Sequence, residues 1–384
     1  MKLLMISGDR SVLQGKRGAF WYTLEEMSKH WERIDIICPQ ATKNQQPATS
    51  NEGIVHTFFN HVHFHPSPRA LWQQPWWILE KGSELIAEHH HDVMTVHSYP
   101  PFYNDIGAKW LHRSLRQAQG KLSIPFVMEI HHVVGYPIAA SVSERIGYML
   151  SRIYLPRATR CAAAVRCVSR STAELLQRWN IPRIEVVPSF YLDADVLKSD
   201  ASIEKKYDVV ACARFVANKG MSELLHAINK MPDAKLLIIG DGPLRSSLES
   251  QAQHLGIANR VTFAGWLSEN ADVYRALQSG KIFVMNSKSE GGPRVALEAM
   301  ALGLPIIATK VGVMPEVIED GKNGLFTTGE PDDLAAKIEV LLHDAQLRER
   351  LGAESRKVLD RFERCRLIQK YAGFLKHVAS LKKL

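Results

Sequence analysis

Cysteine is scarce in this sequence, and apolar runs long enough to cross a bilayer are absent. The cysteines are odd in number and lack the spacing of a metal site; they are Cys38, Cys161, Cys167, Cys212 and Cys365. They indicate reduced thiols rather than a disulfide framework. Met1 leads directly into a strand-like segment, without the pattern of a signal peptide. We therefore expect a cytoplasmic protein without membrane-spanning helices.

The chain has 384 residues, which is too long for one ordinary hydrophobic core and fits two domains. Its composition, 46% apolar and 23% charged, is typical of a folded protein. The net charge of +8 and the pI near 9.1 indicate an anionic partner. A nucleotide, a membrane surface or a nucleic acid would each fit that charge.

Strand-like and helix-like segments alternate through both halves of the chain. The expected strands are 2–7, 33–38, 54–59, 93–97, 126–131, 162–168 and 184–188, and then 207–213, 234–240, 261–264, 282–286, 305–309 and 324–327. The expected helices are 20–30, 71–89, 105–119 and 171–179, and then 220–229, 243–254, 270–278, 294–301, 314–319 and 331–343. This alternation predicts α/β domains whose parallel sheets are covered on both faces. Ligands then bind at the carboxyl ends of the strands.

The periodicity lapses between Val187 and Ala201, which we interpret as an interdomain hinge. The predicted organisation is a first domain at 1–188, a linker at 189–206, a second domain at 207–360 and a closing helix at 361–384.

The most informative stretch is Lys281–Met300, in which a β-rich run ends in a small polar loop and a helix follows. Gly291 and Gly292 let backbone amides approach a ligand, and Pro293 suits a helix start. Free N–H groups and the positive end of the helix dipole favour a phosphate there. Glu290 precedes the helix and Glu298 lies in its second turn, where carboxylates could accept hydrogen bonds from sugar hydroxyls. The alternative is a loop and helix whose glutamates face water.

The block from Glu290 to Glu298 resembles the Glu-x7-Glu signature of family 4 retaining glycosyltransferases. That resemblance implies the GT-B fold, with two Rossmann-like doubly wound parallel-sheet domains facing a cleft. It also implies a nucleoside diphosphate-sugar donor such as a UDP- or GDP-sugar, and a saccharide or lipid-linked acceptor in cell-envelope polysaccharide or glycolipid synthesis. No cofactor, no metal and no nucleic acid would be required.

Further segments of the second half resemble the same family. Arg214 and Lys219 match its pair of cations on the donor pyrophosphate, and Gly240–Pro243, with Gly242, matches its Gly-x-Gly-Pro turn. Gly265 and Trp266 match a segment that contacts the base. The resemblance assigns the donor sugar to Glu290 and the ribose to Glu298. The diphosphate would be bound by the two cations and by the segment of Gly291, Gly292, Pro293, Arg294 and Val295.

In the first half, the loop from Gly8 to Gly18 and His131 match the family more loosely. The family's loop is glycine-rich and closes over donor and acceptor, whereas Gly15 and Gly18 here are separated by two cations. A surface turn is the alternative. His131 ends an expected strand, where the family has a histidine near the donor sugar. We interpret it as functional rather than structural.

Two other groups remain open. The clusters His61/His63/His65 and His89–His91 could bind zinc adventitiously, but no cysteine or aspartate at ligand spacing accompanies them. Trp72, Trp76 and Trp77 suggest an interfacial surface or an aromatic sugar platform, with core packing as the alternative.

The closing segment 361–384 is a basic amphipathic helix. It carries seven basic residues and one acid, and therefore +6 of the net +8. It suggests a peripheral enzyme on the inner face of the cell membrane. The alternative is that its apolar side packs on the first domain.

Four other functions remain as alternatives. A nicotinamide-dependent oxidoreductase would need Gly-x-Gly-x-x-Gly after the first strand, which is absent. A nucleic-acid-binding module would need a basic stripe with aromatics, and only the tail is strongly basic. Within the GT-B group, a nucleotide-sugar epimerase or a phosphorylase stays open.

Overall fold

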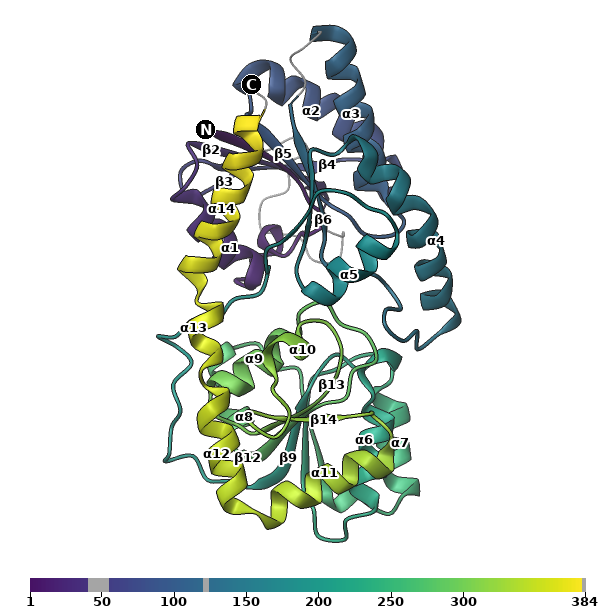
Figure 1. The fold of residues 1–384 in the computed structure, drawn as a ribbon, viewed down its shortest axis with the longest axis vertical. Helices are drawn as coiled ribbons and strands as arrows, with labels where there is room; N and C mark the ends of the chain where they lie inside the picture. The colour runs from purple at the N-terminus through teal and green to yellow at the C-terminus, as the bar shows by residue number, and fades with distance from the viewer. Residues whose placement is uncertain (41–54, 120–123, 382–384) are drawn as a thin grey trace.

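The computed structural model describes residues 1–40, 55–119 and 124–381. It consists of two α/β domains, one above the other in Figure 1. The first residue of the strand expected at 54–59, and Lys382 and Lys383 of the basic tail, lie outside the described residues.

The first domain is built on an eight-stranded sheet in the order β3-β4-β2-β1-β5-β6-β7-β8. All neighbouring strands are parallel except β3 and β4, which pair antiparallel at one edge. The strands are β1 (Lys2–Ile6), β2 (Arg33–Pro39), β3 (His56–Phe58), β4 (Val62–Ser67), β5 (Val93–His97), β6 (Phe126–Ile130), β7 (Ala164–Cys167) and β8 (Ile184–Val186).

Helices cover both faces of this sheet because side chains alternate along each buried strand. Leu3 and Met5 of β1 belong to one core cluster, whereas Leu4 and Ile6 belong to another on the opposite face. The helices are α1 (Ala19–Ser28), α2 (Gln74–His89), α3 (Tyr103–Gln119), α4 (Val142–Ala158) and α5 (Arg170–Arg178). The expected doubly wound arrangement is therefore confirmed for this half.

The second domain has a six-stranded, wholly parallel sheet in the order β11-β10-β9-β12-β13-β14. Its strands are β9 (Tyr207–Cys212), β10 (Leu236–Ile239), β11 (Val261–Gly265), β12 (Gly280–Met285), β13 (Ile306–Thr309) and β14 (Leu325–Thr327). Its helices are α6 (Met221–Asn229), α7 (Arg245–His254), α8 (Asn270–Gln278), α9 (Arg294–Ala301), α10 (Met314–Val317), α11 (Pro331–His343), α12 (Ala345–Ser355) and α13 (Val358–Phe362). Short 3₁₀ turns are η1 (Val12–Gln14), η2 (Leu71–Gln73), η3 (Thr159–Cys161), η4 (Ala217–Lys219) and η5 (Ala258–Arg260).

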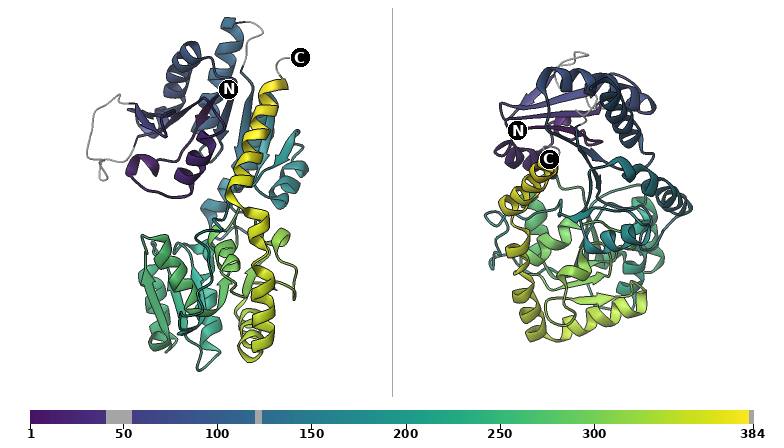
Figure 2. Two further views of the ribbon diagram at one scale, coloured as in Figure 1. Left: turned by 90° about the vertical axis from the view of Figure 1, so that its left-hand side faces the viewer. Right: turned by 45° about the horizontal axis from the view of Figure 1, so that its top comes forward.

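The last helix, α14 (Arg364–Ser380), returns to the first domain (Figures 1 and 2) and packs against α1 and β5. Glu363 caps its start by accepting hydrogen bonds from the amides of Cys365 and Arg366. The apolar side of this helix is buried in the first domain's core, through Leu367, Ile368, Tyr371, Leu375 and Val378. Packing on the first domain therefore explains the tail's amphipathic pattern.

Helices α4, α12 and α13 and strand β4 lie outside the elements expected from the sequence. Pro156 in the last turn of α4 and Pro66 in β4 are breaking signals in a sequence. The structure accommodates Pro66 near the end of its strand and Pro156 close to the helix C-terminus.

Candidate active site

A cleft of about 630 Å³ lies between the two domains. Its first-domain side includes His131, which directly follows β6, and its second-domain side includes Arg214, Lys219 and Glu290. The full lining is Ala19, Tyr99, His131, His132, Val134, Glu144, Val168, Ser189, Phe190, Tyr191, Arg214, Val216, Asn218, Lys219, Ser289, Glu290, Gly291, Gly292 and Arg294. A space of this size suits a drug-sized or nucleotide-sized ligand.

The loop between β12 and α9 supplies much of the second-domain side. Asn286 fixes its start by donating hydrogen bonds to the carbonyls of Gly220 (3.2 Å) and Gly329 (3.0 Å). Ser287 then donates to the Glu290 carboxylate at 2.8 Å. Helix α9 begins at Arg294, one position after the proline, so its first free N–H groups follow this loop directly.

Glycine is required at two positions because the loop touches the first domain and the linker. A Cβ on Gly291 would lie 2.3 Å from the His131 carbonyl oxygen, and one on Gly292 would lie 1.8 Å from the Phe190 ring. Both distances are far below van der Waals contact. The glycines therefore set how closely the two sides of the cleft approach.

The two cations of the cleft differ in whether they pair with a carboxylate. Lys219 forms an ion pair with Glu290. Within residues 1–40, 55–119 and 124–381, no carboxylate pairs with Arg214, so its guanidinium is available to an anion. An ammonium has three donors, so Lys219 can hold Glu290 and still donate to a phosphate.

Glu298 lies behind this surface rather than in the cleft lining. Its carboxylate accepts hydrogen bonds from Arg294 Nε at 2.9 Å and from the Tyr274 hydroxyl at 3.2 Å. Burial raises the pKa of Glu298, and the bonds from Arg294 and Tyr274 oppose that rise. Arg294 lines the cleft and is bonded to Glu298, which does not line it.

His131 is held by a buried network that the sequence analysis missed. His97, Glu129 and Arg166 are direct register partners on β5, β6 and β7. Glu129 accepts hydrogen bonds from Arg166 Nη1 at 2.6 Å, from His131 Nε2 at 3.1 Å and from the Tyr371 hydroxyl on α14. Burial alone would raise the pKa of Glu129, but Arg166 and the two histidines hold it well below its usual range.

An ionised carboxylate only accepts hydrogen bonds, so Nε2 of His131 carries a proton in this arrangement. In the part of the chain that the structure describes, no hydrogen bond engages Nδ1, which leaves this atom to interact with a ligand. The signal for this network was present in the sequence. Glu129 and Arg166 are opposite charges inside expected buried strands, and a buried charge needs a partner.

His97, Glu129 and His131 also lie close enough together to hold a metal ion in principle, with ligand atoms within 4.8 Å of one another. However, the Arg166 guanidinium already bonds the same Glu129 oxygen that faces both histidines. A metal cation would have to share that oxygen with a fixed positive charge. The donor set therefore fits a hydrogen-bonded anchor better than a metal centre.

A second cavity of about 270 Å³ adjoins the cleft within the first domain. It shares Ala19, His131, Ser189 and Tyr191 with the cleft. Its polar lining also includes Asp9 from the loop after β1 and Tyr371 from α14. His131 therefore lines both spaces.

Several predicted site residues do not line the cleft. Pro293 and Val295 flank Arg294 without contributing, and Gly15 and Gly18 lie in the loop before α1, which supplies Ala19 instead. Gly242 has a packing reason, because a Cβ there would lie 2.6 Å from the Phe215 carbonyl oxygen. Trp266, next to Gly265, is 74% exposed.

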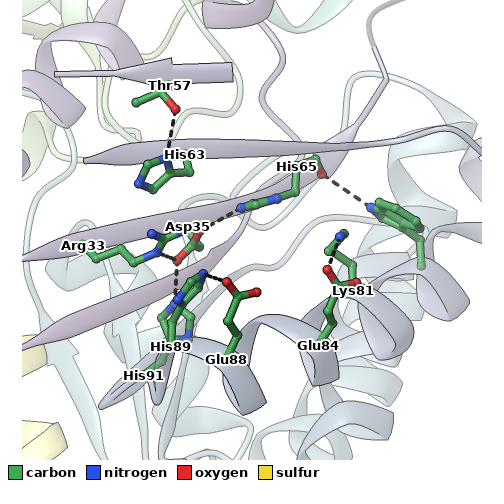
Figure 3. A network of polar contacts seen from close by, with 11 residues as sticks. Arg33, Asp35, Thr57, His63, His65, Lys81, Glu84, Glu88, His89 and His91 are labelled. Atoms are coloured by element: carbon green, nitrogen blue, oxygen red, sulfur yellow. Dashed lines mark hydrogen bonds and ion pairs between the residues drawn. The ribbon is translucent and has the colours of Figure 1, made fainter. Parts of the chain in front are cut away.

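One histidine of each cluster, His65 and His91, belongs to a buried polar network around Asp35 (Figure 3). Asp35 on β2 accepts hydrogen bonds from His65 (2.7 Å), His91 (2.8 Å) and Arg33 (2.6 Å). Burial would raise the pKa of Asp35, but these three partners hold it well below its usual range. The network ties β2 and β4 to the end of α2.

The three tryptophans differ in how far they are exposed, so core packing does not explain them all. Trp72 and Trp76 are 58% and 48% exposed, and they contact each other edge to face. Trp77 is partly buried, below Arg69 and Lys81, and its indole N–H points to the His65 carbonyl at 3.4 Å. Core packing thus accounts for Trp77 alone.

Two family models match adjoining parts of the chain. The model described as "Glycosyltransferase Family 4" matches residues 21–191, and the one described as "Glycosyl transferases group 1" matches residues 194–358. Sulfoquinovosyl transferase SQD2 of Arabidopsis thaliana is 31% identical over 258 residues, which are 63% of this chain and 50% of that protein. The lipopolysaccharide core biosynthesis glycosyltransferase LpsE of Rhizobium meliloti is 31% identical over 222 residues, which are 56% of this chain and 64% of that protein. The matches thus span between half and two thirds of these relatives.

Solved structures share the fold across the full chain. Sucrose-phosphate synthase from Thermosynechococcus elongatus has a TM-score of 0.81 at 18% identity, covering 99% of this chain and 100% of that one. HepE from Anabaena, in complex with UDP and glucose, has a TM-score of 0.73 at 20% identity, covering 98% of this chain and 100% of that one. These similarities establish the two-domain architecture expected from the sequence.

Proposed function

The chain belongs to the family 4 type of GT-B glycosyltransferases, and from that premise we propose that it transfers a sugar from a nucleoside diphosphate-sugar to an acceptor with retention of configuration. The observation that carries the proposal is the cleft itself. Arg214, Lys219 and the glycine loop before α9 approach from one domain, and His131 approaches from the other.

The donor would lie with its diphosphate on the second domain. Arg214 and Lys219 supply two positive charges, and the N-terminus of α9 adds amide donors, so the leaving diphosphate is stabilised without a bound metal. HepE, with UDP and glucose in its complex, supports a donor of this class. Glu290 would bind the sugar hydroxyls, and Glu298 would bind the ribose once Arg294 moves aside.

The reaction breaks the bond between the anomeric carbon and the diphosphate oxygen and forms one to the acceptor oxygen. The acceptor's proton passes to the departing phosphate oxygen on the same face, which retains the configuration. His131, with Nε2 anchored by Glu129, would present Nδ1 to the donor sugar. Closure of the cleft would exclude water from this step.

The acceptor would enter through the 270 Å³ cavity next to His131. Relatives in lipopolysaccharide core synthesis and sulfoquinovosyl transfer support a saccharide or lipid-linked acceptor. We place the reaction in glycolipid or cell-envelope polysaccharide synthesis at the inner face of the membrane. Within the described residues, no helix combines the length and apolar character that crossing a bilayer requires.

A thermal-shift panel of UDP, GDP and ADP with their sugars tests the donor, because a ligand that binds the folded state raises its apparent stability. The informative variants are Arg214→Ala, Lys219→Ala and Glu290→Gln. Arg275→Ala is the matched control, since among the residues that the structure describes Arg275 pairs only with Asp272, at the surface.

We expect one nucleotide to stabilise the protein and the control, and the two cation variants to lose at least about tenfold in affinity for its diphosphate. Glu290→Gln should lower transfer more than nucleotide binding. Normal transfer in all three variants would refute the assignment. An epimerised donor without a transferred product would instead indicate the epimerase, and turnover without a nucleotide would indicate the phosphorylase.

A further inference from the structure

Helix α4 exposes an apolar stripe to solvent. Val142, Ile146, Met149, Leu150 and Ile153 are each between 52% and 70% exposed. Their spacing places them on one side of the helix, within an arc of roughly 100°. We call these residues the α4 stripe.

The opposite side of α4, with Ser151, Leu155 and Ala158, is buried. The helix therefore packs on the domain through that side, and the stripe is not its core face. Single exposed apolar residues are ordinary, whereas a contiguous exposed apolar patch indicates an interaction site. Ile138, which precedes the helix and is 56% exposed, adjoins the stripe in sequence. Figure 1 shows α4 at the outer edge of the first domain, on the side away from α14.

The charges beside the stripe are all positive. Arg145, Arg152, Arg157 and Arg160 are exposed, and no ion pair involves them within the described parts of the chain. The acid in this segment, Glu144, turns inward and accepts a hydrogen bond from the amide of Ala140 at 2.7 Å. An apolar helix face with an arginine border is the pattern of a helix that lies in a membrane interface.

We propose that the α4 stripe docks this protein on an anionic lipid surface, with its apolar side chains among the acyl chains and its arginines at the headgroups. The inference rests on the proposed function, because docking on lipid would give the enzyme access to a lipid-linked acceptor. It assigns membrane contact to α4 rather than to the basic tail, whose apolar side is already buried.

The charge pattern argues against a second copy of this chain as the occupant. Pairing two α4 stripes would bring together eight arginines, four from each copy, without an exposed acid from either helix. Anionic lipid headgroups neutralise the same arginines, and each cation near such a surface strengthens binding.

The start of α4 adjoins the donor cleft. The amide of Ile138 donates to the Lys288 carbonyl at 3.3 Å, and Pro137 forms a β-bridge with Ser289, directly before Glu290. Glu144 in the first turn lines the cleft. Seating the stripe on a membrane would therefore hold the cleft entrance near the lipid headgroups.

Co-sedimentation with phosphatidylcholine vesicles, with and without phosphatidylglycerol, tests the proposal. Met149→Glu/Ile153→Glu removes apolar contact, and its matched control is Val340→Glu on α11, where the valine is 50% exposed. Arg145→Glu/Arg152→Glu reverses two charges, and its control is Lys370→Glu on the exposed side of α14. Thermal shift with the nucleotide that stabilises the wild type reports folding and donor binding in every variant.

We expect the wild type and both controls to bind only the anionic vesicles, more weakly as salt rises. Binding should fall about fivefold for each arginine lost and about tenfold or more in the apolar double variant, with nucleotide binding unchanged. The proposal is overturned if the wild type ignores anionic vesicles or if the α4 variants bind like the wild type. It also fails if the wild type dimerises through α4 in sedimentation without lipid. If the wild type binds anionic vesicles but none of the nucleotides, only the donor assignment is refuted.

Discussion

Replacing Tyr371 by phenylalanine tests whether the C-terminal helix positions the cleft histidine. The Tyr371 hydroxyl bonds one oxygen of the buried Glu129, whose other oxygen is bonded by Arg166 and His131. Burial and the neighbouring Glu129 raise the pKa of Tyr371, so its hydroxyl remains a donor. Tyr371→Phe keeps the ring, over which the Arg166 guanidinium lies at 3.7 Å, and removes only the hydrogen bond.

A hydrogen bond to a buried charged group contributes roughly 1.5–3 kcal/mol, so we expect the free energy of unfolding to fall by about 2 kcal/mol. The matched control is Tyr136→Phe, because that hydroxyl accepts one bond from Arg178 at 3.1 Å near the surface. The control should lose less than about 0.5 kcal/mol in denaturant unfolding.

The catalytic effect separates positioning from stability. If Tyr371 acts through Glu129 on His131, kcat should fall about tenfold while the donor KM changes little, since only the transition-state contact is disturbed. Adding Tyr371→Phe to His131→Ala should then cost no further activity, because the two changes act on one unit. Additive losses, or an unchanged kcat in the single variant, would refute the positioning role.

Three further predictions follow from buried groups and close contacts. Burial raises the pKa of Asp105 to about 7 in the folded state, whereas the unfolded value is about 3.9. The stability of the wild type therefore falls as pH rises between these two values. Asparagine does not titrate, so Asp105→Asn should be more stable than the wild type by about 1–3 kcal/mol across that range in thermal unfolding. Gly291→Ala places a Cβ 2.3 Å from the His131 carbonyl and should weaken donor binding about tenfold in calorimetry, whereas Gly373→Ala, with open space around it, should not. Asp35→Asn removes the carboxylate from its three basic partners and should destabilise the fold by about 3–5 kcal/mol. Because the folded pKa of Asp35 is depressed, its stabilisation is present above the unfolded pKa of about 3.9 and is lost as pH falls below it, a loss that the asparagine variant should lack in acid unfolding.

Local patterns predicted most of the architecture, because buried parallel strands and their covering helices leave periodic signals. They also placed Arg214 and Lys219 after one strand and Glu290 after another, and the sheet brings them to one cleft. A charge inside an expected buried strand signals that a partner is needed, but not which residue that partner is. Glu129 and Arg166 are 37 residues apart and meet only because β6 and β7 are in register. The same limit applied to the histidine clusters, whose shared partner is a distant aspartate.

Sequence patterns also could not tell which amphipathic helix faces outward. The tail and α4 both alternate apolar and polar residues at helical spacing, and only the packed structure shows that the tail covers the first domain while α4 is left uncovered. Hydrophobic periodicity specifies that a face is apolar but not what covers it. The basic charge of the tail suggested a membrane contact, but the tail's apolar side is buried, and the membrane contact that we propose is through α4.

The way the chain crosses between its domains limits how the cleft can open. The linker and the junction before α14 run side by side, since the amide of Leu192 donates to the Phe362 carbonyl at 2.6 Å and the amide of Arg364 donates back to the Leu192 carbonyl at 3.1 Å. The two segments that connect the domains are hydrogen-bonded to each other and act as one hinge. The domains can therefore rotate about this hinge more easily than they can slide apart. Tyr371 lies two turns further along α14 and bonds the carboxylate that anchors His131. If the domains rotate about this hinge, His131 would stay with the first domain while Arg214 and Lys219 move with the second. The close contacts of Gly291 and Gly292 would then limit how near these cations come to the histidine around the proposed donor.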